Sequence, residues 1–128
     1  MNIEIDDGLN DINSENLARA VNKLNCFDFG SLEDLSESQT QDVFKIMSED
    51  TNLKMFGTPL CNLALECMEH IAAVDPQTLA KAIHNLEEVR LDFEDSKLSL
   101  FQYIAIFKRF GGETKLKKVW SQDQVWSL

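Results

Sequence analysis

The sequence predicts an α/β fold in which short strands and helices alternate and stack side by side. Three observations lead to this expectation. Segments of sequence recur at a nearly constant offset, the recurring segments carry helical stripes of apolar residues, and short segments between them alternate as strands do. The chain has 128 residues, of which 44% are hydrophobic, so we expect one globular domain over residues 1–128.

The recurrence involves three pairs of segments that occur in the same order along the chain. The pairs are residues 16–24 with 78–86, residues 35–47 with 98–110, and residues 51–63 with 114–126. Leu, Ala, Ser, Gln, Phe and Lys recur at equivalent positions, and the offsets of the three pairs differ by one position at most. Agreement on nearly one offset indicates a repeated structural unit.

The first two pairs of segments have the pattern of helices. Leu17, Ala20, Val21 and Leu24 lie at i, i+3, i+4 and i+7, which places one apolar stripe on a helix. The equivalent stripe is Leu79, Ala82, Ile83 and Leu86. Helix starts are indicated by two Ser-x-x-Gln capping boxes and by an Asp-Pro pair, at Ser36–Gln39, Ser99–Gln102 and Asp75–Pro76.

Between the helices, four hexapeptides share the form Leu-x-x-φ-x-φ, where φ is an apolar residue in most copies. Positions four and six face one side of a strand, so strands are expected near residues 24–29, 53–58, 86–91 and 116–121, with an earlier one near 3–5. Residues 63–74 form an apolar run that predicts an extra helical turn or a second short helix. A lone strand–helix unit buries too little apolar surface to fold, so neighbouring units must stack.

The succession of one short strand and one helix, repeated at the spacing of these hexapeptides, resembles the leucine-rich repeat, in particular its ribonuclease-inhibitor-like class. The pattern of that family is L-x-x-L-x-L-x-x-N/C-x-L. One copy fits it through Leu53, Phe56, Thr58, Cys61 and Leu63, and the last copy through Leu116, Val119, Ser121, Gln124 and Trp126. The resemblance implies a short leucine-rich-repeat-like solenoid of about four to five units, with parallel strands on the concave face and helices on the convex face.

The functional surface of such a solenoid would be its concave strand face. The third positions of the hexapeptides are Cys26, Met55, Glu88 and Lys118, and the fifth positions include Asp28, Gly57, Arg90 and Trp120. Trp and Arg are enriched among binding hot spots. We therefore predict that the residues binding a protein partner are Asp28, Met55, Glu88, Arg90, Lys118 and Trp120; the competing interpretation is a solvated sheet face without a partner.

The net charge of −10 disfavours nucleic-acid binding, which depends on Lys and Arg displacing counterions from phosphates. The charge is uneven: residues 1–64 carry four basic and twelve acidic side chains, and residues 65–128 carry eight and ten. No apolar run is long enough for a membrane helix. The acidic residues 1–11 lack the features of a secretory signal, and three cysteines without a CxxC pair suit a reducing compartment, so a cytoplasmic location is expected.

Signals for catalysis or metal binding are weak. Cys61, Cys67 and His70 lack the paired spacing of structural zinc ligands, and core packing is the favoured interpretation for the cysteines. His84 lies late in a helix, where a cationic side chain suits the helix dipole. No nucleophile motif or phosphate-binding glycine loop occurs. We therefore expect no enzyme, no cofactor and no metal.

The expected function is non-catalytic protein binding, as an adaptor, regulator or scaffold acting through the concave face. One alternative is a small acidic chaperone or effector that binds through its helices, and another is an enzyme subunit with an unrecognised site. The apolar C-terminal segment, with Trp120 and Trp126, either covers the open end of the stack, marks a truncation from a longer repeat protein, or forms a contact for self-association.

Overall fold

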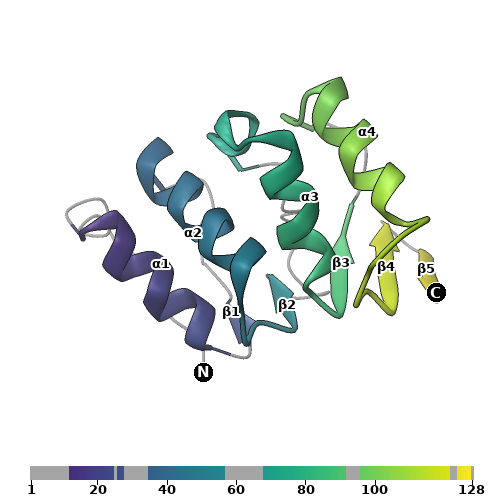
Figure 1. The fold of residues 1–128 in the computed structure, drawn as a ribbon, viewed down its shortest axis with the longest axis horizontal. Coiled ribbons are helices and arrows are strands. Elements are labelled where there is room, and N and C mark those ends of the chain that lie inside the picture. The colour runs from purple at the N-terminus through teal and green to yellow at the C-terminus, as the bar shows by residue number, and fades with distance from the viewer. Residues whose placement is uncertain are drawn as a thin grey trace.

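Figure 1 shows the computed structural model of the chain, which describes residues 12–24, 26–27, 35–56, 68–91, 96–121 and 124–127. The described helices are α1 (Ser14–Lys23), α2 (Glu37–Glu49), the 3₁₀ helix η4 (Ile71–Ala73), α3 (Pro76–His84) and α4 (Leu100–Arg109). The described strands are β1 (Cys26–Phe27), β2 (Met55–Phe56), β3 (Glu88–Arg90), β4 (Lys118–Ser121) and β5 (Gln124–Ser127).

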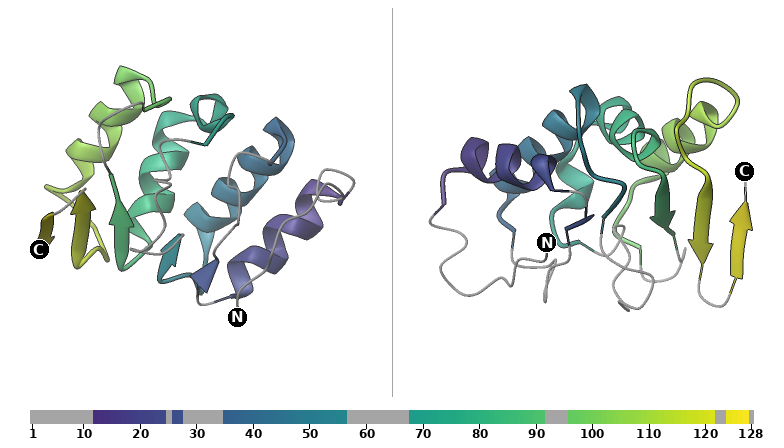
Figure 2. Two further views of the ribbon diagram at one scale, coloured as in Figure 1. Left: turned by 180° about the vertical axis from the view of Figure 1, so that it is seen from behind. Right: turned by 90° about the horizontal axis from the view of Figure 1, so that it is seen from below.

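The α-helices form one layer and the strands form a second layer beside it (Figures 1 and 2). Helices that follow one another in the chain are neighbours in space: α1 packs on α2, α2 on α3 and α3 on α4. The buried core lies between the two layers, where residues of the helix stripes such as Val21 and Ile83 meet strand residues such as Val89 and Val119.

The strands follow the order β1-β2-β3-β4-β5 across the sheet. The pairs from β1 to β4 are parallel, and β5 pairs with β4 in the antiparallel direction. The antiparallel pair joins Ser121 to Gln124, so the connection between these strands is very short. A connection that short permits only antiparallel pairing, because a parallel partner needs a crossover of a dozen or more residues.

The predicted fold class, a solenoid with parallel strands on a concave face, is wrong. Among the described strands only β3, β4 and β5 exceed two residues, and these three form a small mixed sheet because β5 runs antiparallel. The four α-helices dominate the described part of the chain. Gln124 and Trp126, assigned to repeat positions after the last strand, instead lie within β5.

The predicted helix starts are confirmed. Ser36 and Ser99 each cap a helix, and the glutamine three residues later completes both capping boxes. Asp75 caps α3, with Pro76 at its first position. The extra helical turn expected in residues 63–74 is present as η4. The strand expected near residues 3–5 lies outside the described residues.

Each capping-box glutamine also ties its helix to the chain segment that precedes the neighbouring helix. The Nε2 of Gln39 donates to the carbonyl of Ile12 at 3.1 Å. The Nε2 of Gln102 donates to the carbonyls of Ile71 and Val74 at 2.9 and 2.8 Å. Ile12 and Val74 are separated by the same offset as the matched segments that begin at positions 16 and 78, so both halves of the chain use the same link.

Replacing Gln102 with alanine is expected to lower the free energy of unfolding by about 2–4 kcal/mol. The change removes the reciprocal cap of α4 and leaves the buried carbonyls of Ile71 and Val74 without the donor that Gln102 supplies. Urea denaturation followed by circular dichroism measures the loss. Gln77→Ala, on the exposed side of α3, is the control and should cost less than about 0.5 kcal/mol; equal losses in the two variants would contradict the role of Gln102.

Candidate functional site

Five of the six residues predicted to bind a partner lie in β2, β3 and β4, where strand pairing arranges them in two rows. In one row, Met55 pairs with Glu88, and Glu88 pairs with Lys118. In the other row, Arg90 pairs with Trp120. We call these five residues the outer sheet face.

The outer sheet face points away from the core. Val89 and Val119, the residues between the two rows, are buried, whereas the members of the rows are half-buried or exposed. This alternation follows from the two-residue period of a strand. The sixth predicted residue, Asp28, lies outside the described residues, as does Gly57, so their places in this surface stay predictions.

An ion pair joins two of the strands on this face. The carboxylate of Glu88 lies 3.8 Å from the ammonium of Lys118. Both side chains are partly exposed, so the pair contributes little to stability. The opposite charges of Glu88 and Lys118 balance each other in the row that also contains Met55. The other row carries the cationic Arg90 and the aromatic Trp120.

Trp120 is half-buried, and its indole Nε1 is shielded from solvent without a hydrogen-bond partner. In the described part of the chain, Arg109 Nε is the other buried side-chain nitrogen without a hydrogen-bond partner.

The two tryptophans lie on opposite faces of the sheet. On β5, Val125 lies directly opposite Trp120, and Trp126 lies opposite the buried Val119. Cross-strand partners share a face, so Trp126 covers the core side of the sheet and Trp120 the outer side. The two tryptophans therefore do not act together as a cover of the core.

A second surface feature was missed from the sequence. The turns leading into β2, β3 and β4 enclose a groove of about 590 Å³. Glu87 lines this groove, and its carboxylate lies 3.8 Å from the ammonium of Lys54 and 3.2 Å from that of Lys117. The groove is lined by Thr51, Asn52, Leu53, Lys54, Asn85, Glu87, Thr114, Lys115, Leu116 and Lys117.

The hydrogen bond from Lys117, with the charges of Lys117 and Lys54, holds the pKa of Glu87 below its ordinary value. The signal for this arrangement was present in the sequence, because the second positions of three hexapeptides are Lys54, Glu87 and Lys117. Parallel strands in register place equivalent positions side by side, so alternating charge at one position predicts ion pairs across the strands.

Nothing in the described part of the chain brings together three or more His, Cys, Asp or Glu side chains in a way that could hold a metal ion. Cys61 and Cys67, which were weighed as ligands, lie outside the described residues. His70 is half-buried in the turn before η4.

His84 has a structural position at the end of α3. Its Nε2 lies 2.9 Å from the carbonyl of Ile106, and its Nδ1 lies 2.5 Å from the hydroxyl of Thr114. Since a carbonyl only accepts, Nε2 carries the proton and Nδ1 accepts from Thr114. The ring of Phe110 packs edge-on against the imidazole, with the ring centroids 4.6 Å apart. His84 thus joins α3 to α4 and to the segment that leads into β4.

The equivalent position in the first half of the chain is Asn22, because residues 16–24 match residues 78–86. Its Nδ2 donates to the carbonyl of Val43, at 3.2 Å, and its Oδ1 accepts from the hydroxyl of Thr51, at 2.6 Å. Val43 and Thr51 are in turn the counterparts of Ile106 and Thr114 in the other two pairs of matched segments. An amide and a neutral imidazole therefore perform the same bridging role in the two halves.

Burial lowers the pKa of His84 below its ordinary value of 6.5, and the nearby charge of Arg109 lowers it further, against an opposing effect of the hydrogen bond with Ile106. The expectation that His84 acts as a cation that suits the helix dipole is therefore wrong, because burial favours the neutral ring. A histidine whose pKa is lower in the folded than in the unfolded state stabilises the fold fully above pH 6.5 and less as the pH falls below that value.

Comparisons of the chain with family models, curated proteins and solved structures found no match. The resemblance to leucine-rich repeat proteins therefore stays a prediction from the residues alone. Within the described ranges, none of the helices combines the length and the apolar character needed to cross a bilayer.

Replacing His84 with asparagine is expected to flatten the loss of stability between pH 7 and pH 5, because asparagine supplies the same donor and acceptor without titrating, as Asn22 does. Thermal unfolding of both proteins across this pH range measures the difference. The control is Gln77→Asn, at an exposed position of α3, which should retain the original pH dependence. Identical pH profiles for His84→Asn and the original protein would contradict the buried neutral imidazole.

Replacing Trp120 with phenylalanine is expected to change the free energy of unfolding by less than about 1 kcal/mol, because the lost ring contact is offset by removal of an unpaired donor. Val119→Ala, on the adjacent buried position, should cost about 2 kcal/mol. Chemical denaturation of both variants tests the contrast. A larger loss for Trp120→Phe than for Val119→Ala would show that the indole nitrogen is bonded.

Proposed function

We propose that the chain is a non-catalytic protein-binding module, an adaptor, regulator or scaffold, that binds its partner through the outer sheet face. The observation that supports this proposal is the alignment of Met55, Arg90 and Trp120 on neighbouring strands. Arg and Trp are among the side-chain types that supply most of the binding energy at protein interfaces, and Met is common at adaptable binding surfaces. Glu88 and Lys118 would lie among them as a balanced charge pair that orients the partner.

The outer sheet face is supported by a buried layer of strand residues, which suits contact with another protein. The outer sheet face is built from strands whose alternate residues are buried, so the rows are held by a rigid layer. The predicted partner is a protein whose contacting surface carries an acidic group for Arg90 and an apolar group that packs on the indole ring of Trp120. The odd number of cysteines and the absence of a CxxC pair support a cytoplasmic location for this interaction.

The triple variant Met55→Ala, Arg90→Ala, Trp120→Ala is expected to lose at least roughly 100-fold in affinity, since two hot-spot side chains of about 2 kcal/mol each are removed. A partner is first recovered by crosslinking in lysate, then purified and titrated by calorimetry against the original chain and the variant. The matched control replaces three exposed helix residues, Glu37, Lys45 and Lys81, with alanine.

Full affinity in the outer-face variant would contradict the proposal. Loss of affinity only in the helix variant would favour the alternative of an acidic chaperone or effector that binds through its helices. Substrate turnover by the isolated chain would favour an enzyme.

A further inference from the structure

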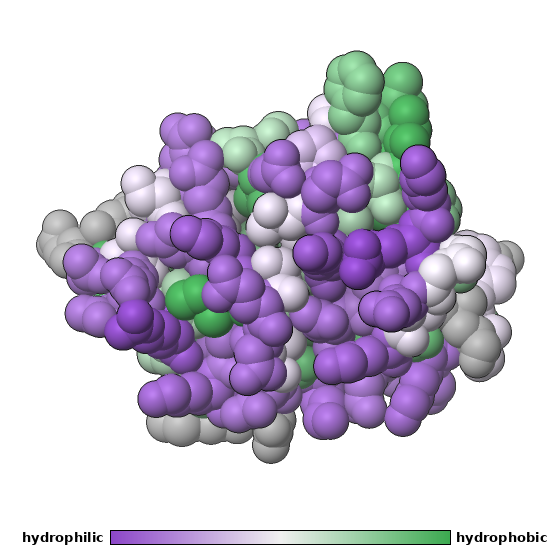
Figure 3. Space-filling view, in the orientation of Figure 1, coloured by the Kyte–Doolittle hydropathy of each residue, from purple (hydrophilic) through white to green (hydrophobic). Residues whose placement is uncertain are grey.

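The exposed surface of α4 is unusually apolar. Leu100 and Phe101 are 71% and 74% exposed, and Ile104 and Phe107 are 52% and 51% exposed. Figure 3 shows a hydrophobic group that projects from the largely polar surface at the α4 end of the molecule. We call these four residues the α4 face. Single exposed apolar residues are common, but a contiguous group of large ones marks an interaction surface.

Helix packing within the chain does not require this composition. In the matched segments, the positions of α2 equivalent to Leu100, Phe101 and Ile104 carry Glu37, Ser38 and Gln41. These three residues remain exposed although α3 packs on α2. The same surface is therefore polar on an internal helix and apolar on α4.

Phe107, the fourth residue of the α4 face, lies at the end of the layer of described helices. Phe44, the counterpart of Phe107 on α2, is fully buried beside its neighbouring helices. Phe107 is half exposed because no helix in the described part of the chain packs on the far side of α4. The α4 face therefore combines two kinds of exposed position. Leu100, Phe101 and Ile104 occupy positions that are exposed on α2 as well, and Phe107 occupies a position that is buried on α2.

The sheet ends at the same side of the molecule. Within the described residues β5 pairs only with β4, so its other edge is open. Its residues Val125 and Trp126 are 42% and 46% exposed. Together α4 and β5 hold all the exposed large apolar residues of the described chain except Ile12. An open edge flanked by apolar side chains is a surface on which another strand can pair.

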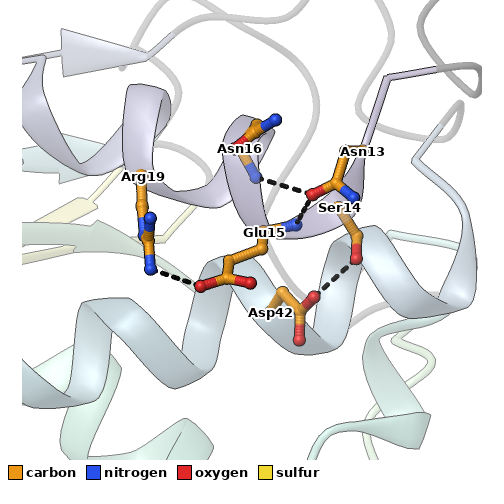
Figure 4. Close-up of polar contacts among 6 residues, drawn as sticks. All are labelled: Asn13, Ser14, Glu15, Asn16, Arg19 and Asp42. Carbon is orange, nitrogen blue, oxygen red and sulfur yellow. Dashed lines mark hydrogen bonds and ion pairs between the residues drawn. The ribbon is translucent and has the colours of Figure 1, made fainter.

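The opposite end of the molecule has different chemistry. The exposed side chains of α1 include Asn16, Arg19 and Lys23. Figure 4 shows Arg19 paired with Glu15, and Ser14 donating to Asp42 of α2 at 2.5 Å. Within the described residues, the exposed side chains of α1 are polar or charged except for Ala20, so this helix does not complement the α4 face. Head-to-tail stacking of copies is therefore disfavoured.

We propose that two copies of this chain associate through their α4 ends about a two-fold axis. The α4 face of one copy packs on the α4 face of the other. A two-fold axis makes this contact self-complementary, because it places the same four residues of each copy opposite one another. This interaction goes beyond the proposed binding of a partner by the outer sheet face.

The available area suits a modest dimer. The four side chains of the α4 face offer on the order of 500 Å² per copy, because a large aromatic side chain buries ~150–250 Å². Two copies then bury on the order of 1,000 Å², the lower limit for a specific interface. We expect dissociation in the micromolar range.

The first test is the mass of the chain in solution from low micromolar to submillimolar concentration. Multi-angle light scattering and sedimentation velocity should show twice the 14.6 kDa of one chain at high concentration. Ile104→Glu should raise the dissociation constant at least roughly tenfold, because the contact would bury an unpaired charge. The matched control is Ile12→Glu, a similarly exposed isoleucine at the opposite end, 45% against 52%, which should dimerise as the original chain does.

The second test separates a two-fold contact from other modes of assembly. Ile104 lies in the middle of the α4 face, so Ile104→Cys should form a symmetric disulfide between copies on oxidation, and Ile12→Cys should not. Circular dichroism establishes that each variant is folded. A monomer at every concentration would overturn the proposal, as would growth into larger species, dimerisation that survives Ile104→Glu, or crosslinking of Ile12→Cys alone.

Discussion

Two pairs of buried polar side chains hold neighbouring units of this protein in a fixed relative position. Gln39 and Gln102 connect their helices to the segments preceding α1 and α3, and Asn22 and His84 connect the ends of those helices to the following units. Each of these residues donates to a backbone carbonyl in another unit. A buried carbonyl without a donor is costly, so these bonds permit little sliding of one unit on the next.

This constraint determines the surfaces on which the proposed functions depend. The links place each turn so that the strand after it enters the sheet in register, with Glu88 beside both Met55 and Lys118. A slip of one residue would exchange the buried and outward side chains of a strand. Among the described helices, α4 has a neighbour on one side only, which leaves Phe107 half exposed at the end of the helix layer.

Much of this organisation was predictable from the sequence because its signals are local. The helix starts follow from the capping boxes, and the alignment of the outer rows follows from the shared form of the hexapeptides. The direction of β5 was not predictable from the repeat pattern, because Gln124 and Trp126 match positions of a continuing unit. Their pairing with β4 depends on a contact that the spacing of apolar residues does not reveal.

The polar links were also hidden in the pattern. Gln102 was identified as part of a cap, but its second role depends on carbonyls that lie far away in the sequence, in the unit before its own. His84 was interpreted from its place on a helix, whereas its surroundings come from α4 and the segment before β4. Residues that act between units have properties that only the packed units define. The ion pairs of Glu87 differ, because the second positions of the hexapeptides already carry their signal.

The strand register is tested most directly by nuclear Overhauser effects between backbone protons in isotopically labelled protein. The structure predicts contacts between the strands at Met55 and Glu88, at Glu88 and Lys118, and at Arg90 and Trp120. A pattern shifted by one residue, with Arg90 beside Val119, would turn the proposed binding residues toward the core and contradict the account.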